Sequence, residues 1–343
     1  MVMDKVAVMP PERRGDLFRE TAARRRLPWQ LVEKDFWVSW ALGRLFSLSG
    51  LPASLLFKGG TSLSKVFDAI DRFSEDVDLS LNREDLGFAA EKDPYAAPSR
   101  KQARRLIDEL ARTCQRAIRE ELLPALERDF ASVLGPARNA WSLRISETDP
   151  QTVFFAYPRA EGVAAAPLPA YVTPAVYLEM GARSDHWPVV EAPIQPYAAQ
   201  EFPKLFSRPH AVVRALSAER TFWEKVTLLH TEHHRPAEKS IAERLSRHYY
   251  DVFRLCQGPI GERALADTGL LASVVRHKTL FFHSGWANYD SAVPGSIRIL
   301  PPDYRIAELR RDYASMAEMI FGEPPEFDTV FSDLESLERR LNA

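Results

Sequence analysis

The chain has 343 residues, of which 45% are hydrophobic and 27% charged, with a formal net charge of −2 at pH 7. This composition is typical of a soluble globular protein and excludes disordered and fibrous classes, and the length predicts two packed domains. No apolar run approaches the roughly 18 residues of a membrane span, and the first ten residues lack the basic and apolar regions of a signal peptide. Cys114 and Cys256 provide neither a metal quartet nor a disulfide framework, so we expect a reduced, cytoplasmic protein.

Helical patterns open the chain, and the region after them mixes strands and helices. Two helices are predicted between about Glu12 and Leu48, with a break at Leu27-Pro28. A short buried strand follows and ends at Gly59-Gly60. Further along we predict a polar loop over 82–99 and a long helix over 100–130, kinked at Pro124. Strand-like runs follow at 141–146, 152–157, 175–180 and 189–197, with a loop over 159–174 between the second and third.

The C-terminal part is predicted to be mainly helical from about Ser217, apart from residues 281–300. Prolines cluster over 202–210, and we place the domain boundary there. The predicted domains are therefore 1–205 and 206–343.

The glycine pair Gly59-Gly60 sits between a strand and a helix. Thr61 or Ser62 is expected to cap that helix, whose apolar side chains Leu63, Val66, Phe67 and Ile70 follow the helical repeat. The first turn of such a helix exposes backbone N–H groups that bind anions, and glycine lets a phosphate approach the backbone closely. Lys65, one turn into the helix, adds a cation. Taken alone, this pattern is also that of an ordinary strand–turn–helix.

Two aspartates lie two residues apart on the next predicted strand. The period of two puts Asp76, Asp78 and Ser80 on one face and apolar residues on the other. Carboxylates in this arrangement can converge on one or two divalent cations such as Mg²⁺ or Mn²⁺. A strand with a polar face often simply faces water. Here the pair follows a glycine turn and a short helix, which favours a metal and phosphate site.

These residues resemble a known pattern. The runs Lys58-Gly-Gly-Thr-Ser-Leu63 and Ser74-Glu-Asp-Val-Asp-Leu79 are similar to the core of the polymerase-β nucleotidyltransferase superfamily. More fully, the chain resembles the AbiEii/AbiGii toxin family, with its MenT-like toxins, of bacterial toxin–antitoxin and phage-defence systems. Three other stretches match the same family in the right order: 33–38, 219–230 and 247–255. The resemblance implies an α/β (α+β) fold, with an N-terminal mixed-sheet nucleotidyltransferase domain and a C-terminal helical domain that contributes to the active cleft.

The resemblance also implies roles for particular residues. Asp76 and Asp78 would bind the metal ion, with Glu179 on a neighbouring strand as a third carboxylate for metal binding or proton acceptance. Lys225 would reach the triphosphate of the nucleotide, and Asp251 would hold Lys225 or orient the substrate. The residues implied to contact the nucleotide are Lys58, Gly59, Gly60, Thr61, Ser62, Lys65 and Ser74.

Several of these residues also have a plain structural reading. Glu179 and Lys225 are each also compatible with a solvated position. Asp251, with Arg247 and Arg254 about one turn away on either side, fits a surface ion-pair ladder. Glu224 is expected to form a positioning ion pair. The histidines at 230, 233 and 234 lack partners for a zinc site and favour a basic helix end.

Two other features are compatible with nucleic-acid binding. Trp286 and Tyr289 can stack on a base, although such aromatics more often fill a domain seam. Basic residues gather along the predicted long helix and either contact a nucleic-acid backbone or form a solvated face. They are Arg100, Lys101, Arg104, Arg105, Arg112, Arg116 and Arg119.

The function implied by the resemblance is transfer of a nucleoside monophosphate from an NTP to an acceptor hydroxyl, with release of pyrophosphate. The implied acceptor is the 3′ end of tRNA, the implied outcome is blocked translation, and a cognate antitoxin is the implied protein partner. We expect a monomer with no membrane partner. Two alternatives stay open: transfer to a protein or small molecule, and a non-catalytic nucleotide-binding interaction module.

Overall fold

The computed structural model describes residues 3–74, 76–136, 140–160, 173–206 and 210–343. The chain divides into two compact units. The first, here called the sheet unit, comprises Met1–Val66, Ser74–Asp93 and Arg105–Ala215, and the second, the helical unit, comprises Phe67–Phe73, Pro94–Arg104 and Leu216–Ala343. Part of the predicted loop over 159–174, residues 161–172, and part of the predicted boundary over 202–210, residues 207–209, lie outside the described residues.

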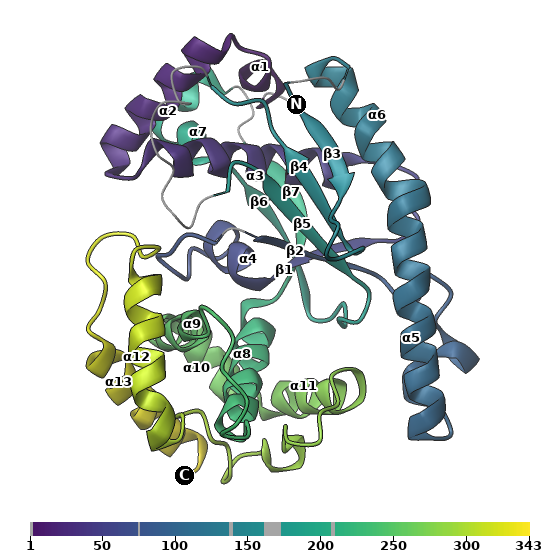
Figure 1. Cartoon of the computed structure of the whole chain (residues 1–343), viewed down its shortest axis with the longest axis vertical. Coiled ribbons are helices and arrows are strands. Elements are labelled where there is room, and N and C mark those ends of the chain that lie inside the picture. Colours follow the sequence, from purple (N-terminus) through teal and green to yellow (C-terminus); the bar gives the residue numbers. More distant parts are fainter. Residues whose placement is uncertain (1–2, 75, 137–139, 161–172, 207–209) are drawn as a thin grey trace. The chain divides into compact units, whose positions relative to one another are not determined.

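The sheet unit opens with three helices, α1 (Met3–Ala7), α2 (Pro11–Arg25) and α3 (Trp29–Ser47). The predicted break between two helices is confirmed, and the chain turns there through Arg26 in a left-handed conformation with φ of 55°. Helix α3 is buried along most of its length. Its Trp37 and Trp40 rings each lie 5.9 Å from the ring of Phe155 on the sheet, and Figure 1 shows α3 running across the strands.

A seven-stranded mixed sheet carries this unit, as the fold class predicted from the sequence requires. Strand order is β3-β4-β5-β2-β1-β7-β6, with β1 and β2 antiparallel and β2 and β5 parallel. The bounds of the strands are β1 Leu55–Lys58, β2 Asp76–Leu81, β3 Ser142–Ile145, β4 Thr152–Ala156, β5 Val176–Gly181, β6 Val189–Ile194 and β7 Ala211–Leu216.

Strand β7 was not predicted. It pairs in parallel with β1, with Phe57 in register with Ala215. Its residues directly follow a proline-rich stretch that we read as a boundary. The alternation that marks it, with Ala211 and Val213 buried and Val212 exposed, spans too few residues to stand out.

The helix after the glycine pair is shorter than predicted. Helix α4 spans Gly59–Lys65, and its N-cap is Lys58, with no side-chain cap. The predicted capping by Thr61 or Ser62 is therefore wrong, because both residues lie inside the helix. Its predicted continuation to Ile70 is also wrong, since the chain passes through Asp68 in a left-handed conformation with φ of 49°.

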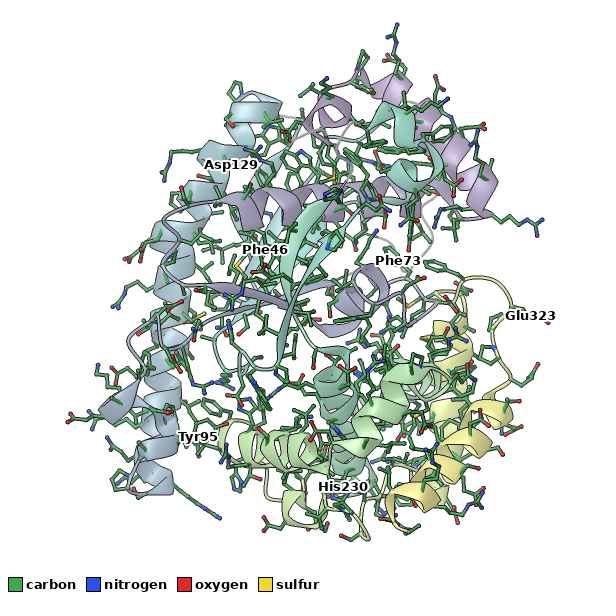
Figure 2. All side chains as sticks on the ribbon, turned by 180° about the vertical axis from the view of Figure 1, so that it is seen from behind. Phe46, Phe73, Tyr95, Asp129, His230 and Glu323 are labelled. Carbon is green, nitrogen blue, oxygen red and sulfur yellow. The ribbon has the colours of Figure 1, made fainter. Side chains whose placement is uncertain are left out.

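The predicted long helix is present with a local irregularity. Helix α5 (Arg100–Ala117) leads through a π-helical turn (Ile118–Leu122) into α6 (Leu123–Leu134). Pro124 has no N–H and cannot continue the regular hydrogen-bond pattern, which accounts for an irregular turn just before it. Asp129 on α6, labelled in Figure 2, forms ion pairs with Arg44 of α3. The shorter helices are η1 Ala90–Lys92, η2 Pro94–Ala96, α7 Tyr197–Glu201 and η4 Pro203–Leu205.

The helical unit contains six longer helices and two segments from earlier in the chain, Phe67–Phe73 and Pro94–Arg104. The first of these packs against the end of α12 (Asp303–Ala317). The segment Phe67–Phe73 pairs with residues near 320: the Phe73 N–H donates to the Met319 carbonyl at 2.7 Å, and the Phe321 N–H donates to the Asp71 carbonyl at 2.8 Å. Within the described residues no helix is long and apolar enough to cross a membrane. The bounds are α8 Ala218–His233, α9 Ser246–Cys256, α10 Pro259–Ala266, α11 Thr268–Phe281, η5 Tyr289–Ser291, α12 Asp303–Ala317 and α13 Phe327–Leu341.

Candidate active site

The two faces of β2 differ as its sequence predicted. Val77, Leu79 and Leu81 are buried, whereas Asp76 and Asp78 are partly exposed on the opposite face. Ser80 departs from the prediction because it is fully buried on the polar face, where its hydroxyl lies 3.1 Å from Nε2 of His186. The polar face open to ligands is therefore the N-terminal half of the strand, at Asp76 and Asp78.

Asp78 lies directly against the glycine turn. A Cβ built on Gly59 would lie 1.8 Å from Oδ2 of Asp78, which no real side chain tolerates. Gly59 also has φ of 78°, a left-handed conformation that favours glycine. The close approach of Asp78 and the left-handed backbone each require glycine at this position. Both allow the turn to contact the Asp78 carboxylate.

Cross-strand pairing aligns further charged residues with Asp78. Lys58 of β1 and Glu179 of β5 are its register partners on the two sides. Directly paired residues of neighbouring strands share a face, so the three side chains form one row across the sheet. Glu179 is exposed, and its predicted role as a third carboxylate stays a prediction.

Thr61 and Ser62 use their hydroxyl groups within the sheet unit. The Thr61 hydroxyl donates to the backbone carbonyl of Asp76 at 2.5 Å and lies 3.4 Å from that of Ser74. The Ser62 hydroxyl donates to the Gly59 carbonyl at 2.9 Å. Both side chains are buried. Thr61 thereby fixes the start of the aspartate strand to the helix that follows the glycine turn.

The donor set suits a hard divalent cation such as Mg²⁺. Asp76 and Asp78 provide oxygen ligands on one face of β2, and the absence of a Cβ at Gly59 leaves the Asp78 carboxylate room beside the backbone. Among the described residues, no group of three or more His, Cys, Asp or Glu side chains is placed to hold a metal ion. The fit therefore rests on the two aspartates, with remaining positions for nucleotide oxygens and water.

Lys65 is held inside the sheet unit. Its ammonium group forms an ion pair with Asp35 of α3, lies 4.2 Å from the ring centroid of Tyr197 and 3.4 Å from the Gln195 carbonyl. Burial lowers the pKa of Lys65 and raises that of Asp35. A phosphate-binding role for Lys65 would have to break this buried pair, and it stays a prediction.

We expect Asp35→Asn to lower the free energy of unfolding by about 3–5 kcal/mol, because it leaves a buried cation without its anion. Chemical denaturation of the purified variant measures the loss. Asp16→Asn, which removes the exposed partner of Arg19, is the control and should change little. An equally small change for Asp35→Asn would show that the buried pair does not support the fold.

The helical unit contains a second charged group, which we call the buried triad: Arg72, Lys225 and Asp251. The Arg72 guanidinium binds both carboxylate oxygens of Asp251, at 2.7 and 2.8 Å, and the Lys225 ammonium lies 2.8 Å from Oδ2. Their exposed fractions are 3%, 6% and 0%. The contact between Asp251 and Lys225 expected from the sequence is thus present. The alternative, a surface ion-pair ladder of Asp251 with Arg247 and Arg254, is wrong. Asp251 is fully buried, and Arg254 pairs with Asp71 instead.

Burial and neighbouring charges shift the pKa values of Asp251, Lys225 and the adjacent His248. Burial alone would raise the pKa of Asp251, but Arg72 first and Lys225 second outweigh it and hold that pKa well below its usual range. Burial lowers the pKa of Lys225 more than Asp251 raises it. Burial and Lys225 together lower the pKa of His248, whose Nδ1 lies 3.4 Å from the Lys225 ammonium. A neutral His248 can accept a hydrogen bond there.

Helix α8 begins and packs as its sequence pattern predicted, but Lys225 does not point outward. The Ser217 hydroxyl caps the helix by accepting the Arg220 N–H at 3.2 Å, and Phe222 and Val226 are fully buried. Glu224 forms the expected ion pair, with Arg220 at 3.3 Å. Lys225 itself is buried rather than extended into solvent, because Asp251 draws it inward.

The histidines of α8 have structural roles. His230, labelled in Figure 2, lies 3.0 Å from the Asn288 carbonyl through Nε2 and accepts the Arg298 N–H at 3.0 Å through Nδ1. His233 lies 2.6 Å from the Leu300 carbonyl. They attach the segment after α11 to α8. Trp286 is half-buried, with the Arg235 guanidinium 4.6 Å from its ring centroid.

Arg72 is the member of the buried triad that the sequence patterns did not indicate. Its sequence neighbours gave one signal: it comes two residues before Ser74 and four before Asp76, within the stretch that carries the metal-binding pattern. Its partner, Asp251, is 179 positions away, so no local pattern joins the two.

The mixed sheet places the glycine turn against Asp78, one of two aspartates on one face of β2, which is the arrangement that the sequence resemblance implied for a nucleotidyltransferase. Residues 40–333 match the model of the family described as nucleotidyl transferase AbiEii toxin, type IV toxin–antitoxin system. The chain belongs to this family, and membership implies an NTP substrate and an antitoxin partner.

Two solved structures are similar to this chain. JHP933 from Helicobacter pylori is 11% identical, with 91% of this chain and 92% of that chain covered and a TM-score of 0.43. MenT4, a nucleotidyltransferase toxin from Mycobacterium tuberculosis H37Rv, is 14% identical, with 94% of this chain and 98% of that chain covered and a TM-score of 0.42. A search of curated proteins gave no match.

Proposed function

We propose that this toxin transfers a nucleoside monophosphate from an NTP to the 3′ end of tRNA and thereby blocks translation in the bacterial cytoplasm. The observation that carries the nucleotidyl-transfer part is the contact between Gly59 and the Asp78 carboxylate, with Asp76 on the same face of β2. The choice of tRNA as acceptor is supported by the family resemblance of the motifs. Phage defence is proposed on the same ground.

Asp76 and Asp78 would hold a divalent cation, Mg²⁺ or Mn²⁺, which when bound neutralises phosphate charge and orients the triphosphate. The backbone at Gly59 and Gly60 is proposed to receive phosphate oxygens, with Lys58 and Ser74 as nearby polar contacts. Lys225 is proposed to supply positive charge to nucleotide phosphate, and Asp251 to hold Lys225 in place. Thr61 acts through the backbone of Asp76.

The reaction requires attack of the acceptor hydroxyl oxygen on the α-phosphorus and departure of pyrophosphate. The acceptor proton must leave as the new bond forms, and Glu179, in register with Asp78, is the proposed acceptor of that proton. No covalent bond to the protein is needed. Orientation of the two reactants and neutralisation of phosphate charge therefore supply most of the rate.

Expression of wild type and Asp76→Ala in growing cells, with sequencing of tRNA 3′ ends, tests this proposal. We expect growth arrest and extended tRNA ends with the wild type, and neither with Asp76→Ala, because one of the two metal ligands is lost. Arrest by both proteins alike would contradict toxicity by catalysis. Arrest by the wild type with unchanged tRNA would contradict only the acceptor, and labelled NTPs with lysate protein would then identify a protein acceptor.

A further inference from the structure

The outward face of α5 carries a row of basic side chains, here called the basic stripe. At about 100° per residue, Lys101, Arg104, Arg105, Arg112 and Arg116 fall within an arc of roughly 120°, and the row extends about 22 Å along the helix axis. All five are exposed. Arg119, in the π-helical turn that follows, is exposed as well.

The opposite face of α5 explains why the stripe points outward. The residues on that face are buried and apolar, so the rotation of the helix about its axis is fixed by packing. They are Ala103, Leu106, Ile107, Leu110, Cys114 and Ala117. The basic stripe is therefore a permanent surface feature rather than one of several possible orientations.

The stripe lacks the acidic partners that several other exposed arginines have. Arg263, Arg310 and Arg340 are about half exposed and each pairs with a carboxylate. Over the part of the chain that the structure describes, none of the five α5 side chains of the stripe forms an ion pair. Asp108 is the one acidic residue within the arc, and Glu109 beside it pairs with Lys92 at 3.1 Å.

We propose that the basic stripe binds the phosphate backbone of the RNA acceptor. Charge complementarity identifies the occupant: five cations in a line, in a chain whose net charge is −2, match a regular row of phosphates. The long side chains reach phosphates without requiring a particular base sequence, so the stripe supplies affinity and orientation rather than sequence recognition. The choice of RNA as the polyanion rests on the proposed function.

Binding of labelled tRNA to the full-length protein tests the stripe. The variant Arg105→Gln/Arg112→Gln/Arg116→Gln should bind roughly 10- to 100-fold more weakly, and the slope of log affinity against log salt should fall by about 2–3, because three phosphate contacts are lost. The matched control, Arg263→Gln/Arg310→Gln/Arg340→Gln, has the same change in charge and should leave the slope unchanged. Thermal unfolding verifies that both variants are folded.

A second variant should bind tRNA more tightly, and a gain in affinity cannot result from misfolding. Asp108→Asn removes the one negative charge in the arc and should tighten tRNA binding several-fold. Equal affinity and slope in the wild type and the stripe variant would overturn the proposal, as would the absence of any tRNA binding. Loss of binding to the antitoxin with unchanged tRNA binding would overturn it in favour of a protein interface.

These outcomes are separable from those of the proposed function. If the wild type extends tRNA but the stripe variant binds tRNA normally, the stripe proposal fails and the function stands. If the wild type labels only protein, the tRNA acceptor fails, and the binding measurement still decides the stripe.

Discussion

Gly59→Ala should reduce nucleotidyl transfer by at least about 100-fold, since displacing a catalytic group by even 1 Å has an effect of that order. The new methyl group would occupy the place of Asp78 Oδ2, only 1.8 Å away, and would force the carboxylate off its position. The left-handed backbone adds a penalty of about 1–2 kcal/mol in stability. Steady-state kinetics and denaturation of the purified variant measure the two effects separately.

Gly87→Ala is the matched control for this variant. Gly87 has φ of 87°, close to that of Gly59, but a Cβ there would meet nothing within 4 Å. We expect a similar loss of stability without loss of transfer. If both variants kept full activity, the close approach of Asp78 to the glycine turn would have no part in catalysis.

Asp251→Asn should lower the free energy of unfolding by about 3–5 kcal/mol at pH 7, because it leaves two buried cations, Arg72 and Lys225, without an anion. Transfer activity should fall with it, since Lys225 loses the partner that holds it. Asp312→Asn is the comparison variant in the same denaturation series. Its carboxylate accepts the backbone N–H groups of Arg244 and Ser246 at the start of α9. The comparison separates the loss of a buried ion pair from the loss of a hydrogen-bonding carboxylate at a helix start.

The pH dependence of this effect has a definite sign. The pKa of Asp251 is lower in the folded protein than in the unfolded chain, where it is about 3.9. The carboxylate therefore contributes its full stability above about pH 4, and the contribution is lost as the pH falls through the folded pKa. The difference between wild type and Asp251→Asn should be largest near neutrality and shrink in acid. A variant that lost activity but kept wild-type stability would instead place Asp251 in contact with substrate.

Local sequence patterns were sufficient for most of the sheet unit. Alternation in residues 76–81 predicted both the strand and the face that carries Asp76 and Asp78, and the proline at 28 predicted the break between α2 and α3. In each case the signal comes from the backbone geometry of neighbouring residues. For the same reason the N-cap of α8 at Ser217 was predictable.

The features that escaped prediction depend on distant partners. Lys65 resembles an available cation in the sequence, and its pairing with Asp35 arises only because the fold brings the two residues, 30 positions apart, together. In the sequence Asp251 resembles a member of a surface ion-pair ladder, but in the fold it is buried and pairs with Arg72 from a distant segment. Burial of charge is a tertiary property, and a periodic pattern along one helix does not reveal which side of that helix will be covered.

The excursion of Phe67–Phe73 into the helical unit limits how this protein can be divided. The excursion falls between the glycine turn and the aspartate strand, and it is fastened by Asp251 and by the backbone at Met319 and Phe321. A truncated protein that ended at Ala215 would keep every metal ligand and phosphate contact proposed here from the sheet unit. It would also keep the seven residues Phe67–Phe73 between the glycine turn and the aspartate strand, without the helical unit they pack against. Arg72 would then lack its ion-pair partner Asp251. Engineered fragments or split versions of this toxin should for that reason be cut elsewhere than at the apparent domain border.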